Sequence, residues 1–493
     1  MELFSGAIPM STRQPHVPGR PKDRAGIFAA AAAWPAILVS IFVCGPPGVQ
    51  GAQGVSSGGL KPFVIAVIPV VGRSGAVGGV AIDARGVLDR GTRETTGQLR
   101  RAWLAAMVPA QGEMARASAL RKVSLRRLEA AIADCRDQGK PLPLEVQFLA
   151  GLQRVRYILA YPEAQDIVLA GEAGPWTLND TGEVVGQASG QPILQLDDLI
   201  VALRTAEAAS EGPGITCSFD PTEEGLARFD QLMRRQDLTM SEAAVRRLER
   251  ALGDSVITVT GVDADTHFAQ VLVVADWTMK RLAMGFDPAP TDELPSYLQL
   301  LQAGDRVPPR NAILRFWLVP QYDAVLRDPE GLAWELVGNG VQALTEAGLL
   351  AGQGRVADAG RPDPLAQQWT DSFTRQYSLL AAKLPVFASL RNCIDLAVVA
   401  AIANREQLLQ RTNWAASSLL LSADQLDVGR YPVPRTTPSR ASYVERQSEY
   451  VVSISGGVDL DSWSVLKPAA VRRPLAALRA ASAPPRSKTW WWD

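Results

Sequence analysis

One segment of the chain gathers residue types that can move protons. His267, Asp276 and Lys280 lie in the mostly apolar run THFAQVLVVADWTMKRLAM, whose composition predicts a helix within residues 265–284. The chain has two histidines, and the other, His16, lies in the N-terminal region. His16 lies in the segment predicted to be removed on export, so one histidine is left. A single histidine excludes multi-histidine metal sites and leaves a serine–histidine–aspartate triad without evident partners. His267 is therefore the first residue to test as a general acid or base.

The spacing within this segment favours structural roles. Asp276 precedes Lys280 by four residues, which is the favourable order for a helical ion pair. His267 and Asp276 are about two and a half turns apart, so their side chains cannot touch within one straight helix. We interpret Asp276 and Lys280 as an ion pair. Asp276 is also kept, together with His267, as a catalytic candidate.

Two adjacent acids, Asp197 and Asp198, form the second candidate set. They fall in the first turn of a helix predicted after Pro192, where the helix dipole favours negative charge. Neighbours on a helix point about 100° apart, so these carboxylates do not face each other as a catalytic pair should. We interpret them as first-turn charges and retain acid/base chemistry as the alternative.

A glycine pattern lies between a predicted strand (332–337) and a predicted helix (342–350). Gly338-Asn339-Gly340-Val341-Gln342-Ala343 matches the G-x-G-x-x-A fingerprint of dinucleotide-binding proteins. The sequence that follows, GQGRVADAGRPDP, supplies no second parallel strand, which that fold requires. A plain turn is the preferred interpretation, and no cofactor is predicted.

Cysteine usage and charge exclude several classes of protein. Cys135, Cys217 and Cys393 are far apart and none belongs to a C-x-x-C pair, so the sequence indicates neither a disulfide framework nor a zinc site. Each is interpreted as a small buried apolar residue, with one disulfide left open. No metal is predicted. The formal net charge of −1 gives no argument for binding nucleic acid or an anionic membrane.

The N-terminus has the order of a signal peptide. Basic residues precede the uncharged run AGIFAAAAAWPAILVSIFVC (25–44), and the small residues around Gly51 and Ala52 follow a Gly-Pro-Pro-Gly turn. Residues 1–52 are therefore predicted to direct export and to be removed. Because the run is about long enough to span a bilayer, an uncleaved membrane anchor is the alternative. No later membrane span is predicted.

The elements around the candidate residues predict an α+β fold with mixed sheets. Strands are predicted at 79–88, 155–160, 166–170 and 183–185, and one long helix over 113–137. SEGPG (210–214) is the predicted boundary between an N-terminal mixed α/β domain, 53–210, and a helix-rich α+β domain, 214–466. Residues 467–493 are expected to form a disordered tail.

The second domain alternates strands and helices. Strands are predicted at 215–219, 255–260, 313–320 and 450–454, and helices at 222–235, 241–252, 365–383 and 386–410. Ser241 is a plausible N-cap for its helix. Phe373, Tyr377, Leu390 and Ile394 belong to an apolar stripe at helical spacing, which is typical of a packed core.

The C-terminus ends in three consecutive tryptophans, Trp490, Trp491 and Trp492. Exposed tryptophans seldom occur without a use, so these side chains are expected to dock either on the protein itself or on a partner.

Several segments resemble a family of secreted bacterial proteins that is catalogued only as a domain of unknown function. They are LRKVSLRRLEAAI, LAGLQRVRYILAYPEAQDIVLAGEAGPW, GQPILQLDDLIVALR, FTRQYSLLAAKLPVFASLRNCIDLAVVAAI and SEYVVSISGGVDLD. The resemblance covers most of the chain after the first fifty or so residues. It implies a shared fold and export, and it carries over no catalytic residues.

Together these observations predict an exported, non-enzymatic structural or interaction protein of the cell envelope, with an envelope protein as its partner. The alternative is an envelope hydrolase that uses carboxylates and His267. The sequence leaves the oligomeric state open.

Overall fold

The computed structural model describes residues 77, 80–91, 101, 104–105, 107, 109–212, 214–235, 241–304, 311–355, 363–414, 419–446, 448–466, 469–485 and 491–493. The predicted signal peptide, 1–52, lies outside these residues. The chain separates by contacts into the units Met1–Ile65 and Ala66–Asp493, and the description below concerns the second unit.

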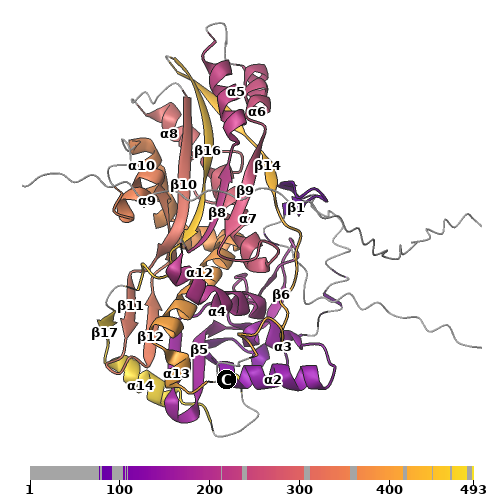
Figure 1. The fold of residues 1–493 in the computed structure, drawn as a ribbon, viewed down its shortest axis with the longest axis vertical. Helices are drawn as coiled ribbons and strands as arrows, with labels where there is room; N and C mark the ends of the chain where they lie inside the picture. Colours follow the sequence, from indigo (N-terminus) through magenta and orange to yellow (C-terminus); the bar gives the residue numbers. More distant parts are fainter. Residues whose placement is uncertain are drawn as a thin grey trace, which may run out of the picture. The chain divides into compact units, whose positions relative to one another are not determined.

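The strands nearest to His267 and the other residues of α7 belong to one large mixed sheet (Figure 1). Strands β10 and β16 run parallel, and the other neighbours in this sheet are antiparallel. Its order is β13 (Gly340–Thr345), β10 (Asn311–Gln321), β16 (Ser448–Leu460), β8 (Ile215–Asp220), β9 (Asp254–Thr260) and β14 (Thr436–Pro438), with β15 (Ala441–Arg446) on β16.

The long strand β16 passes between β10 and β8 because two glycines allow close backbone contact. A Cβ on Gly457 would lie 1.7 Å from the carbonyl oxygen of Cys217 in β8. Gly456 has a φ of +101°, and a Cβ there would lie 2.1 Å from the carbonyl oxygen of Phe316 in β10. No larger residue fits at either position without moving a strand. The strand predicted at 450–454 therefore extends much further than its apolar pattern indicated.

A second sheet combines strands from both halves of the chain. Leu159 of β4 pairs with Ala333 of β12, and β4 also pairs with β5. The order is β17 (Ala470–Val471), β11 (Ala324–Arg327), β12 (Ala333–Val337), β4 (Tyr157–Tyr161), β5 (Asp166–Ala173) and β3 (Ser118–Ser124). Two hairpins complete the strands of the described residues, β1 (Val80–Ile82) with β2 (Leu88–Arg90) and β6 (Trp176–Leu178) with β7 (Val184–Gly186).

Three helices pack together at the centre of the core. Helix α12 (Pro385–Arg405) contacts α4 (Leu196–Glu211) and α7 (His267–Ala283), and α7 lies against β16 and β8. Leu199, Phe268 and Leu396 are fully buried members of one apolar cluster. The two segments separated at 210–214 thus share a core and a sheet, and their division into domains stays a prediction.

The remaining helices confirm the α+β class. Local signals account for several of their starts: Ser241 caps α6 by accepting from Ala244 N, as the sequence indicated, and Thr222 and Asp363 cap α5 and α10. These helices are α2 (Leu125–Asp137), α3 (Leu144–Gln147), α5 (Glu223–Met233), α6 (Glu242–Leu252), α8 (Tyr297–Ala303), α9 (Glu346–Gly352), α10 (Pro364–Arg375), α11 (Tyr377–Lys383), α13 (Leu408–Arg411) and α14 (Pro474–Ala481).

Helix α12 is, within the described residues, the one helix long and apolar enough to cross a membrane. In its most apolar window 94% of the residues are buried by neighbouring elements of the same chain. A helix in the core of a globular domain is buried in the same way, so length and composition alone do not make α12 a membrane span.

The structure corrects the long helix predicted over 113–137. Ser118–Ser124 instead forms strand β3, paired with β5, and α2 begins only at Leu125. Ser124 is the N-cap, since its hydroxyl accepts a hydrogen bond from Arg127 N. The prediction took the lack of a capping-box acid at position 127, where the chain has an arginine, to mean that the helix continues through Ser124, but a single serine cap does not need that acid.

The fingerprint-like glycines also differ from expectation. Gly338 and Gly340 lie where the chain passes from β12 in one sheet to β13 in the other, and Gly340–Thr345 is a strand, where a helix was predicted from residue 342. Helix α9 starts only at Glu346. The strand-to-helix context of a dinucleotide site is therefore missing at this motif.

The described part of 467–493 is ordered where a disordered tail was expected. Residues 474–481 form α14, whose Leu475 is buried against β4 and β5. At the very end, Asp493 and Lys122 exchange two backbone hydrogen bonds of 2.9 Å, and Trp491 O accepts one from Ser124 N. The chain end thus adds to the free edge of β3, a tertiary contact that composition does not reveal.

Candidate functional site

The structure brings His267 and Asp198 together. Thr266 caps α7, so His267 is the first residue of that helix, and Asp198 lies in the first turn of α4. Nδ1 of His267 lies 2.9 Å from Oδ2 and 3.0 Å from Oδ1 of Asp198. The other ring nitrogen, Nε2, lies 3.0 Å from the amide nitrogen of Gln195. An aspartate–histidine pair of this kind is the arrangement that orients a general base.

Burial and charge make this pair a structural one. His267 and Asp198 are 6% and 4% exposed, and both imidazole nitrogens are engaged. Burial alone would lower the pKa of His267, but the nearby carboxylate of Asp198, helped by Asp197 and Glu183, raises it above its usual value. With Nδ1 on Asp198 and Nε2 on the amide of Gln195, both nitrogens of the buried ring are engaged, so the ring is not placed to take a proton from a substrate.

The other acidic candidates lie elsewhere. Asp197 is half-buried and accepts a hydrogen bond of 2.9 Å from Gly429 N. Asp276 is fully buried and pairs with Lys280 at 2.6 Å, which confirms the predicted i,i+4 ion pair. Burial raises the pKa of Asp276 to about 6 although Lys280 opposes this. Asp198 and His267 thus meet, whereas Asp197 and Asp276 do not join them.

The structure describes two of the three candidate tryptophans. Trp490 lies outside the described residues. Trp491 and Trp492 are half-buried, and Trp492 forms an isolated bridge with Val123 of β3. The guanidinium of Arg121 lies 5.4 Å from the ring centroid of Trp492. Both described side chains therefore pack on the protein itself.

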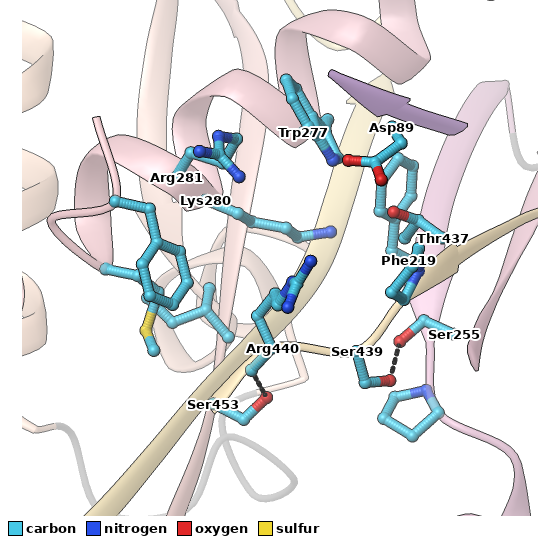
Figure 2. A pocket seen from close by; sticks show the side chains of 15 residues that line it. Asp89, Phe219, Ser255, Trp277, Lys280, Arg281, Thr437, Ser439, Arg440 and Ser453 are labelled. Carbon is cyan, nitrogen blue, oxygen red and sulfur yellow. Dashed lines mark hydrogen bonds between the residues drawn. The ribbon is translucent and has the colours of Figure 1, made fainter. Parts of the chain in front are cut away.

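A pocket opens beside α7 (Figure 2). Lys280 lines it, whereas His267 and the candidate aspartates do not. Its volume is about 60 Å³, far below the roughly 300–1,000 Å³ of small-molecule sites, so it suits a single side chain or small group. Phe219, Met284 and Phe286 are among its apolar walls, and its polar walls include Ser255, Thr437, Ser439 and Ser453.

Basic side chains converge on this pocket. Figure 2 shows Lys280 and Arg440 extending into the same space, with Trp277 and Asp89 beside them. The ammonium of Lys280 is 4.1 Å from the ring centroid of Phe219 and also donates to Gly456 O. Arg440 is exposed, and its guanidinium has no partner within the described part of the chain.

The pocket's third cation is already neutralised. Arg281 makes a two-pronged ion pair with Asp287, at 2.7 and 3.1 Å, and lies 4.7 Å from the ring centroid of Trp277. Burial, with the positive charges of Arg90 and Arg440, lowers the pKa of Arg281. These arginines therefore lie close enough to repel each other, and an added negative charge would be favourable there.

The pocket's hydroxyl groups are satisfied within the protein. Ser255 and Ser439 hydroxyls are 2.7 Å apart, Thr437 donates to Leu88 O, and Ser453 donates to Arg440 O. This leaves Arg440 as the polar group of the pocket that is ready to bind a partner. Sequence reasoning missed Arg440, because in the sequence it is one more basic residue at the end of a stretch rich in proline and serine.

Within the described ranges, no group of three histidine, cysteine, aspartate or glutamate side chains could hold a metal ion. Cys135, Cys217 and Cys393 are free thiols, and burial raises the pKa of the last two well above the usual value.

Comparison with known proteins places one segment of the chain. Neither curated proteins nor solved structures give a match. Residues 217–297, from β8 through α7 to the start of α8, match the model of the family described as "Protein of unknown function (DUF1598)". Secretion and a resemblance over most of the chain stay predictions. The segment supplies both His267 and much of the pocket in Figure 2, and over these residues the chain is similar to that family of unknown function.

Proposed function

We propose that this is an exported, non-enzymatic protein of the cell envelope that binds a partner protein at the pocket beside α7. Export is supported by the order of basic, apolar and small residues within 1–52. An interaction role is supported by the pocket's size, which suits one anchoring side chain better than a metabolite.

The observation that carries the proposal is that one pocket contains both an unpartnered cation and an exposed aromatic ring. Arg440 is exposed and unpartnered within the described residues, and Phe286 of the same pocket is 36% exposed. Arginine and aromatic side chains are the residue types that dominate binding energy at protein interfaces. The fitting partner segment is one apolar side chain next to a carboxylate, which would pair with Arg440.

The alternative, a hydrolase using carboxylates and His267, has less support. Its histidine is buried against Asp198 and Gln195, and none of the residues lining the pocket beside α7 is a histidine. A hydrolytic site needs its base within reach of a bound substrate.

Site-specific photocrosslinking tests the binding proposal. A photoreactive amino acid at Phe286 in the full chain is expected to give a discrete protein adduct in cells, and Arg440→Glu is expected to remove it. The same label at Val471, which is 54% exposed and outside the pocket, is the control for chance contacts. Arg473→Glu, at another exposed arginine, controls for loss of positive charge. Equal adducts at both labels, or an adduct that survives Arg440→Glu, would refute the proposal.

Export is tested by comparing the full chain with a chain that starts at residue 53. The full chain is expected outside the cytoplasm with a new N-terminus near Gly51 or Ala52, and the shortened chain inside. Retention of residues 1–52 in a membrane fraction would indicate the uncleaved anchor, and equal distribution of both chains would contradict export.

A further inference from the structure

A second cavity, of about 270 Å³, lies at the end of β12. Its walls come from several distant segments, among them Gln153, Arg154 and Arg156 before β4, Gln191 before α4, and Arg391 of α12. The turn residue Gly338 closes one side. Three arginines in one cavity make it strongly cationic, and its volume is close to that of small-molecule sites.

One of these arginines is neutralised by a buried carboxylate. Nε of Arg154 donates to Asp395 Oδ2 at 2.8 Å, and Tyr322 OH donates to Asp395 Oδ1 at 2.6 Å. Asp395 is completely buried. Its two oxygens are thus committed to Arg154 and Tyr322.

Arg156 is likewise paired. Its guanidinium reaches Oε1 of Glu335 at 3.0 Å, and Glu335 also accepts from Arg472. The remaining acid of the cavity wall, Glu172, is exposed.

Arg391 differs because no carboxylate is bonded to it in the described residues. Its one hydrogen bond there runs from Nη2 to the amide oxygen of Gln191, at 3.3 Å, and its buried Nε has no partner. Burial and the positive charge of Arg154 lower its pKa, and Asp395 offsets this only in part. Arg391 is half-buried, and a guanidinium whose buried Nε has no partner and to which no carboxylate is bonded in the described residues is costly, which indicates a site for an anion.

Gly340, the first residue of β13, lies close to two of these arginines. Gly340 has a φ of +81°, and a Cβ there would lie 3.3 Å from Cγ of Arg391 and 3.4 Å from Nη2 of Arg154. Both arginines therefore lie against the same backbone atom. The glycines of the G-x-G motif are explained by this close approach and by the turn conformation.

We propose that this cavity binds a small molecule through an oxyanion, a carboxylate or phosphate group, held by Arg391 and Arg154. Planar guanidinium groups bind such anions in two-pronged geometry. Gln153, whose side chain also lines the cavity, supplies an amide donor. The inference is independent of the partner binding proposed at the pocket beside α7.

Thermal unfolding of the full chain at constant ionic strength tests this site. Sodium phosphate, citrate and acetate are each titrated against sodium chloride. At least one oxyanion is expected to raise Tm with a saturable dependence. Arg391→Met is expected to raise the half-saturating concentration at least tenfold, Arg391→Lys by less, and Arg440→Met, in the other cationic pocket, not at all. Phosphate alone or the carboxylates alone would identify the group that the site prefers.

The ligand-free proteins provide a second readout that needs no knowledge of the ligand. If Arg391 exists to bind an anion, Arg391→Met removes a half-buried charge to which no carboxylate is bonded in the described residues, and its ligand-free Tm is not lower than that of the wild type. A marked fall in this Tm would show a structural arginine and overturn the proposal. An equal anion response in wild type and Arg391→Met, or no saturable response to any of the three anions, would also overturn it.

Discussion

Nδ1 of His267 lies 2.9 Å from Oδ2 of Asp198, although 69 residues separate them in the chain. The contact joins the first turns of α7 and α4 inside the core. It places the protein's one described histidine in an ion pair with a carboxylate, and the consequences for stability can be measured.

Replacing His267 with glutamine is expected to destabilise the protein most at mildly acidic pH. The pKa of His267 is raised in the folded state, so its stabilisation is fully present below the unfolded value near 6.5 and is lost as pH rises through the folded pKa. The loss should be about 1–3 kcal/mol at pH 5–6 and smaller at pH 8–9. Urea unfolding of both proteins across this range provides the measurement. A difference that does not change with pH would contradict a raised pKa of His267.

Breaking the Asp276–Lys280 pair from one side should be more harmful than replacing both residues. Asp276→Leu leaves Lys280 buried near Phe219 without its counter-charge, at a cost of about 3–5 kcal/mol. Asp276→Leu with Lys280→Met removes both charges and should recover most of this loss. The free energy of unfolding in urea, measured for the two single variants and the double variant, completes the cycle. Additive losses would show that the two charges are not coupled.

Removal of residues 491–493 should expose the edge of β3. This change deletes the backbone hydrogen bonds between Ser124 and Trp491 and between Lys122 and Asp493. Because a free edge strand can pair with another chain, we expect a lower Tm and concentration-dependent self-association in analytical ultracentrifugation. Trp492→Ala, which retains the backbone, is the control and should stay monodisperse relative to wild type. If the shortened chain matched wild type in both measurements, the C-terminus would not protect this edge.

Alanine at Gly340 is expected to be costly because of both conformation and space. The positive φ of +81° disfavours a side chain by roughly 1–2 kcal/mol, and the methyl group would press on Arg391 and Arg154. Tm should therefore fall, and the response to oxyanions should weaken. The matched control is Gly352→Ala, at the end of α9, where a Cβ would meet no atom within 4 Å. Similar Tm values for the two alanine variants would argue against a tight contact between Gly340 and the two arginines.

Locally determined features were predictable from the sequence. The Ser241 cap of α6 and the Asp276–Lys280 pair depend on residues three or four positions apart, so their geometry follows from the helix alone. The strand Ser118–Ser124 was missed because its pairing partner β5 lies about fifty residues further along. Its own residues, SALRKVS, have no strong strand pattern.

The candidate sites divide in the same way. Arg391 and Asp395, four residues apart in an otherwise apolar helix, were a signal that the apolar stripe around Leu390 and Ile394 obscured. Their relation to Arg154 could not be read from spacing, since it joins positions 241 residues apart. Similarly, the sequence identified His267 as the histidine to test but not Asp198 as its partner.

The amino-acid sequence by itself determined the α+β class, the positions of most helices and strands, and the absence of the usual histidine and cysteine motifs. These follow from hydrophobic periodicity and local hydrogen bonding, which act over a few residues. Only the tertiary structure decided which charges are paired and which are left to bind something else. Arg154 meets Asp395, Asp198 meets His267, and Arg391 keeps no carboxylate of its own within the described residues. The physical reason is that burial and pairing of a charge depend on distant segments brought together by packing of the core.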